Sequence, residues 1–103
     1  MKCINSKTFT ATRAWGALEI AIFNGITVRL HWTNQPYKWH INDGPEVFVV
    51  LDGQIIMHHK TNGNEQASRL TAGDIFCAEV GDEHFAEPIG TARVLVIEKE
   101  GSV

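Results

Sequence analysis

The chain is 103 residues long, which leaves room for one domain, because a second core would be too small to be stable alone. Its 44% hydrophobic and 20% charged residues are typical of a globular protein and exclude a fibrous or disordered one. The formal net charge is −3 and the nine Lys and Arg residues are scattered, which excludes the basic stripe that nucleic-acid binding requires.

The amino-terminal residues and the apolar runs predict a cytoplasmic protein. The longest fully apolar run is Val47 to Leu51, far below the ~20 residues that span a bilayer, so no membrane partner is expected. Residues 1–7 lead into no apolar segment, so no signal peptide is expected either. Cys3 and Cys77 are then expected to be reduced thiols, and the apolar run around Cys77 favours a small buried residue.

The remaining sequence reads as a series of short strands. Residues 18–23 are followed by Asn24-Gly25, a strong hairpin signal, and residues 26–32 then alternate with a period of two. Turn residues separate the other expected strands, which are 37–42, 46–51, 54–60, 66–70, 75–80, 84–87 and 92–99. In the last of them, residues 94–97 are apolar at every position, which suggests burial on both faces.

This pattern predicts an all-β domain. Eight or nine short strands separated by regular turn signals are typical of a sandwich or a barrel, and no segment has a sustained helical period. Without linkers or repeats, residues 1–103 form one domain, with a barrel core over about residues 18–99. So many strands would expose long edges unless the sheet closed, so we expect a closed barrel that dimerises through an edge strand.

Histidines give the first indication of a site. Each of the five is, on its own, most simply a surface or hydrogen-bonded residue. On an extended segment, however, His40 and Asn42 point the same way, and the turn at 43–45 can bring Glu46 back beside His40. Two imidazoles and a carboxylate that converge suit a divalent transition metal. The adjacent His58 and His59 face opposite sides, so at most one of them can point into the barrel.

Two segments resemble the two sequence motifs of the cupins. Residues 39–46, followed six residues later by Gly53, are similar to the first motif, in which a His-x-His pair precedes a Glu and then a Gly. Residues 73–84 are similar to the second motif, which leads from a Gly through a Pro-x-Gly turn to a His. The resemblance covers about residues 25–98. It implies a jelly-roll barrel, the double-stranded β-helix, and a homodimer, since small cupins commonly bury an open sheet edge.

The resemblance also implies a metal site. His40, Glu46 and His84 match the metal ligands of the family, which implies Fe, Mn, Ni or Zn, and in ligand type they match a two-His-one-carboxylate triad. Asn42 replaces the second motif histidine, and Glu79 replaces the proline. Because an amide oxygen is a poorer ligand than imidazole, Asn42 is expected to be a weak ligand. Loss of a contact that only supports a metal ligand typically lowers metal affinity 10–100-fold, so replacement of a histidine ligand is expected to lower it at least as much.

Two functions of different classes remain open at this point, together with a decayed site. The first is a metal-dependent oxygenase, isomerase or lyase that acts on a small polar metabolite. The second is a metal-free module that binds or senses such a metabolite, with His40, Asn42, Glu46 and His84 hydrogen-bonded to one another. In either case, the expected pocket contains Tyr37 at its mouth, Phe48 and Val50 as its apolar floor because they share the parity of Glu46, and Cys77.

Overall fold

Nine strands and one short 3-10 helix make up the protein in a computed structural model that describes residues 1–102. The helix, η1, spans Ser6–Thr8. The strands are β1 (Gly16–Phe23), β2 (Ile26–Thr33), β3 (His40–Ile41), β4 (Glu46–Asp52), β5 (Gln54–Thr61), β6 (Asn64–Thr71), β7 (Ile75–Ala78), β8 (Glu83–Pro88) and β9 (Ala92–Lys99). Within residues 1–102, no helix has the length and apolar character needed to cross a membrane.

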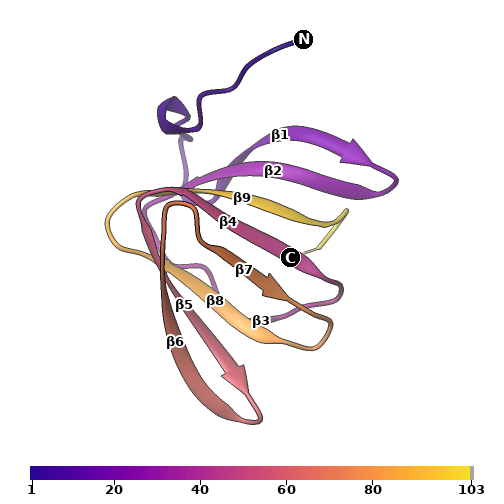
Figure 1. Ribbon diagram of the computed structural model, residues 1–103, viewed down its shortest axis with the longest axis vertical. Coiled ribbons are helices and arrows are strands. Elements are labelled where there is room, and N and C mark those ends of the chain that lie inside the picture. Colours follow the sequence, from indigo (N-terminus) through magenta and orange to yellow (C-terminus); the bar gives the residue numbers. More distant parts are fainter. Residues whose placement is uncertain (103) are drawn as a thin grey trace.

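The strands form two antiparallel sheets that face each other as a flattened barrel (Figure 1). One sheet has the order β1-β2-β9-β4-β7 and the other the order β3-β8-β5-β6. The pairs β2-β9, β4-β9 and β5-β8 join strands that are far apart in the sequence. Such pairing is the jelly-roll arrangement, so the predicted all-β barrel is confirmed.

Two strands, β3 and β7, are shorter than the sequence pattern predicts. The strand predicted over 37–42 is reduced to the two residues of β3, and beyond it the backbone of Asn42 bonds to Asp82 and Gly81 in the loop that precedes β8. The strand predicted over 75–80 ends at Ala78, because the Asp82 carboxylate accepts a hydrogen bond from the Glu79 backbone at 2.8 Å. Both strand ends lie where Asn42 of the first cupin-like motif contacts Gly81 and Asp82 of the second.

The core lies between the sheets and consists of alternate residues of the inner strands. Its members are Phe48, Val50, Ile55, Met57, Leu70, Ala86, Ala92, Val94 and Val96. Leu95 and Ile97 face outward from β9 and are half-buried, so residues 94–97 are fully buried on one face only. Alternation along β9 explains the difference, because only one face of a strand in a two-layer barrel points at the core.

The prediction that Cys77 is buried was wrong, because its side chain is exposed. In the pairing of β4 with β7, Phe76 lies opposite Phe48 and Ala78 opposite Glu46, so Phe76 and Ala78 face inward. Cys77 therefore faces outward from an edge strand. An apolar run of four residues does not reveal which alternate positions are inside.

Gly53, the last residue of the first motif, allows a close approach between two chain segments. It has a positive φ of 81°, and a Cβ there would lie 3.0 Å from Ala92 Cα and even closer to the Thr91 carbonyl oxygen. Gly63 has a similar φ of 77° but has nothing within 4 Å of such a Cβ. A side chain at Gly63 would therefore cause backbone strain alone, whereas a side chain at Gly53 would cause backbone strain and a steric clash.

We predict that Gly53→Ala lowers the free energy of unfolding by more than about 2 kcal/mol, and Gly63→Ala by only about 1 kcal/mol. Both variants place a side chain in the left-handed region, but only Gly53→Ala also forces β9 away. Urea unfolding followed by circular dichroism measures both values. Equal losses in the two variants would contradict the close-approach role of Gly53.

Candidate functional site

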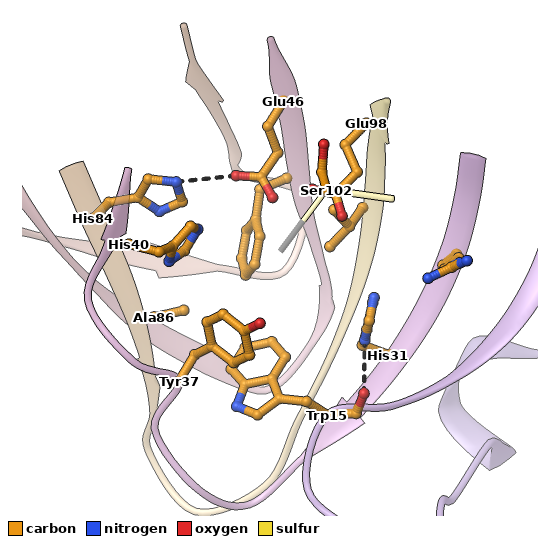
Figure 2. A pocket seen from close by; sticks show the side chains of 12 residues that line it. Trp15, His31, Tyr37, His40, Glu46, His84, Ala86, Glu98 and Ser102 are labelled. Carbon is orange, nitrogen blue, oxygen red and sulfur yellow. Dashed lines mark hydrogen bonds and ion pairs between the residues drawn. The ribbon is translucent and has the colours of Figure 1, made fainter. Parts of the chain in front are cut away.

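Three potential metal ligands come together from both sheets. His40 in β3 and His84 in β8 are directly paired, so their rings lie side by side with centroids 4.4 Å apart. Glu46, the first residue of β4, reaches them from the other sheet (Figure 2). One ligand atom from each of the three residues lies within 4.8 Å of the other two. The structure thus brings together the set expected from the sequence.

His84 Nε2 is the centre of the polar contacts in this cluster. It lies 2.5 Å from Asn42 Oδ1, with which it forms a hydrogen bond, and 3.1 Å from Glu46 Oε1. The contact with Glu46 is not aligned as a hydrogen bond, so Glu46 Oε1 lacks such a partner among the described residues. His84 Nδ1 is also buried without one. Two polar atoms with unmet bonding capacity in one buried site are unusual in a folded protein.

His40 is oriented by the backbone. Its Nδ1 lies 3.0 Å from the Lys38 carbonyl oxygen, so the N–H at Nδ1 donates and the lone pair lies on Nε2. Burial is the main factor that lowers the pKa of His40 below its usual value. A neutral imidazole that donates its other N–H to a carbonyl is the form in which histidine coordinates metals.

A second carboxyl group, Glu98, lies beside Glu46. The two residues are paired across β4 and β9, so their side chains lie on the same face of the sheet. Burial, the hydrogen bond to Glu46 and the charge of Glu46 raise the pKa of Glu98 to about 8. Burial also acts to raise the pKa of Glu46, but the contacts with His84 and Glu98 outweigh it and hold that pKa below the usual value. The two shifts therefore favour the proton on Glu98 and the negative charge on Glu46.

A cavity of about 180 Å³ opens beside the cluster. Of the four residues expected in the pocket, Tyr37 and Phe48 line it, whereas Val50 is sealed in the core and Cys77 lies outside. Val50 points inward as its parity requires, but it lies deeper than the cavity floor, which Phe48, Ala86 and Val96 form. His58 and His59 lie outside the cavity and bond to Glu87 and Ser68.

Several cavity residues were not expected from the sequence. They are Trp15, Arg29, His31, Ala86, Val96, Glu98 and Ser102. The alternation of residues 26–32 separates Arg29 and His31 from the apolar residues of β2, and it is this polar face that turns inward. Trp15 and Ser102 lie outside the regular strands, where no periodic signal exists.

The residues present fit a divalent transition-metal ion. Ligand atoms that bind one ion at about 2.1 Å lie roughly 3 Å apart when they occupy adjacent positions, close to the separation of His84 Nε2 from Glu46 Oε1. Coordination would also use the unpaired oxygen of Glu46. Asn42 Oδ1 is hydrogen-bonded to His84 Nε2, so this bond would have to open before the nitrogen could coordinate the ion.

The protonated state of Glu98 predicts a pH-dependent stability of the metal-free protein. Between its ordinary pKa of 4.5 and its folded value of about 8, the folded protein keeps a proton that the unfolded chain releases. Stability from this group is therefore lost as pH rises. We expect chelator-treated wild-type protein to lose stability relative to Glu98→Gln between about pH 5 and 8, as measured by urea unfolding.

The exposed residue Glu65 in β6 provides the control, since Glu65→Gln is expected to leave the pH dependence unchanged. A constant difference between wild type and Glu98→Gln across this range would show that Glu98 is ionised in the folded protein.

Comparison with known proteins supports the fold. No family model and no curated protein sequence matches the chain. Among solved structures, a cupin-2 domain-containing protein from Shewanella frigidimarina matches with a TM-score of 0.77 and 24% identity, over 87% of this chain and 85% of that one. A cupin superfamily protein from Desulfitobacterium hafniense matches with a TM-score of 0.73 and 15% identity, over 92% and 86%.

A larger protein with the same fold is an enzyme. The hydroquinone 1,2-dioxygenase from Sphingomonas, solved with 4-hydroxybenzoate bound, matches with a TM-score of 0.77 and 20% identity. The match covers 88% of this chain and 29% of the dioxygenase. Architecture, strand order and these matches agree, and the chain has the fold of a small cupin.

Proposed function

We propose that the protein binds a divalent transition-metal ion through His40, Glu46 and His84 and acts as an enzyme on a small polar metabolite in the adjoining cavity. The observation that carries the proposal is the convergence of three ligand atoms within 4.8 Å, with Glu46 Oε1 unpaired, at the wall of that cavity. That a dioxygenase uses the same fold supports the enzymatic alternative.

The protein's own residues have defined tasks under this proposal. A bound Fe, Mn, Ni or Zn ion would polarise a substrate oxygen or bind O₂. The Lys38 carbonyl fixes the orientation of the His40 ring, so Nε2 can bind a metal without loss of side-chain rotational entropy. Glu98 lines the cavity beside Glu46, and its raised pKa favours a protonated carboxyl group there that could donate to a ligand. Phe48, Ala86 and Val96 give the cavity an apolar floor.

One observation favours a second candidate, a metal-free binding module. The hydrogen bond between Asn42 Oδ1 and His84 Nε2 occupies the nitrogen that a metal would use. Asn42 is itself fixed, because its Nδ2 donates to the Gly44 carbonyl at 3.2 Å. A pocket of this kind would bind a polar metabolite with the same affinity before and after chelation.

We expect the wild-type protein, purified without an affinity tag, to bind one Zn²⁺ or Mn²⁺ per chain in isothermal titration calorimetry. His84→Ala removes a ligand and is expected to weaken binding by at least about 100-fold, since even a lost supporting contact costs 10–100-fold. His58→Ala is the matched control, because His58 lies outside the cavity and bonds to Glu87 at 2.8 Å. Equal affinities of the two variants would refute the metal site.

Asn42→His tests whether Asn42 weakens the site. An imidazole in place of the amide is a better ligand for these metals, so we expect metal affinity to rise by about 10-fold or more. The same calorimetric titration measures the gain. If both proteins bind the metal equally, Asn42 is an accepted ligand or a spectator, and the idea of a decayed site fails.

A further inference from the structure

The wall of the cavity across from the metal ligands carries a second polar group, formed by Arg29 and His31 of β2. Figure 2 shows His31 on the opposite side of the cavity from His40 and His84. In the sheet, Arg29 lies opposite Val96 and His31 opposite Val94 on β9. Both side chains therefore share the inward face of β2 with the buried Thr27.

The guanidinium of Arg29 is poorly satisfied within the protein. Within residues 1–102 its one ion pair is with Glu19 at 3.9 Å, and the two side chains are 39% and 51% exposed. Such a long, solvated contact contributes little. No ion pair joins Arg29 to Glu46 or Glu98 in the described part of the chain. The donors of an always-charged guanidinium remain available to a ligand in the cavity.

His31 lies on the same wall, and its neutral form is favoured, so Arg29 is the positively charged residue there. Its Nδ1 donates to the Trp15 carbonyl oxygen at 2.9 Å, which leaves Nε2 as an acceptor. Burial, followed by the nearby charge of Arg29, acts to lower the pKa of His31, and its net pKa lies below the usual value. The Trp15 side chain is positioned in turn, since its indole N–H donates to the Gln35 carbonyl at 2.9 Å.

The sheet sets the distance between the two polar ends. Arg29 and Glu46 lie on β2 and β4, which are separated by β9, and their register differs by two residues, so they are roughly 12 Å apart. The arginine side chain spans part of this distance. The cavity volume of about 180 Å³ is similar to that of cavities of about 150 Å³ that bind benzene, so it suits a ligand of a few carbons.

We infer that the cavity binds a small hydroxy- or oxo-carboxylic acid, with its carboxylate on Arg29 and its other oxygen-bearing end toward His40, Glu46 and His84. One permanent positive charge beside a neutral histidine suits a singly charged, planar carboxylate, which arginine binds through two parallel hydrogen bonds. A doubly charged phosphate would lack a second cation among the described cavity residues. The inference rests on the proposed function only for the end of the ligand that faces the cluster.

The test compares two probes that differ in one group, 4-hydroxybutanoate and the neutral butane-1,4-diol. Binding is followed by two-dimensional NMR titration of the β2 backbone amides and the Trp15 indole, with and without Zn²⁺. We expect the wild type to bind the acid at least about 10-fold more tightly than the diol, because charge-assisted hydrogen bonds are the stronger ones. Arg29→Met should abolish this preference and leave Zn²⁺ affinity within a few-fold.

Two further variants keep the test informative. Arg69→Met, at an exposed position of β6, is the matched control and should keep the preference for the acid. Arg29→Lys keeps the charge without the paired donors and should retain part of it. Equal binding of acid and diol, absence of any acid-induced shift in β2, or a preference that survives Arg29→Met would each overturn the inference.

The outcomes also separate this inference from the metal proposal. An Arg29-dependent preference in a protein that does not bind Zn²⁺ supports the carboxylate site and refutes the metal site. Zn²⁺ binding without any preference for the acid supports the metal site and refutes the carboxylate site.

Discussion

One very short strand, β3, holds the candidate site in register through its pairing with β8. His40 lies opposite His84 only because β3 pairs with β8, and β3 has two residues. The backbone of Asn42 extends this pairing, because its N–H bonds to the Asp82 carbonyl and its carbonyl accepts from Gly81, each at 2.9 Å. Asn42 thus supports the site through its main chain as well as its side chain. These backbone bonds do not depend on the identity of residue 42, so the side chain there can change the chemistry without moving the strand.

The electrostatics of the site depend on carboxyl groups that share one proton. Glu46 and Glu98 are neighbours on adjacent strands, and burial makes two negative charges there unfavourable. The pKa of Glu46, which contacts His84, is lowered and that of Glu98 is raised, so the charge is favoured on Glu46 and the proton on Glu98. The same distribution leaves a negative oxygen directed at the histidines and a neutral group toward the cavity. Arg29 then supplies the permanent positive charge on the far wall.

Most of the fold and the centre of the site could be predicted from the sequence, for identifiable reasons. Turn residues marked the strand boundaries, and motif spacing singled out His40, Glu46 and His84, which the structure brings together. The inward polar face of β2 could not be predicted, because its other face is apolar and an apolar face normally marks the inside. The apolar residues around Cys77 likewise led to the wrong prediction that its side chain is buried. The homodimer and the cytoplasmic location remain predictions.

The placement of the three ligands has a mechanical consequence for the barrel. His40 and His84 belong to one sheet and Glu46 to the other, so an ion held by all three would cross-link the two layers at the open end. The opposite end is already closed by the packed core. Binding energy at such a cross-link becomes folding energy, because the unfolded chain offers no preformed site. Loss of the ion would therefore loosen the mouth of the barrel first, where hydrogen exchange of β3 would report the opening.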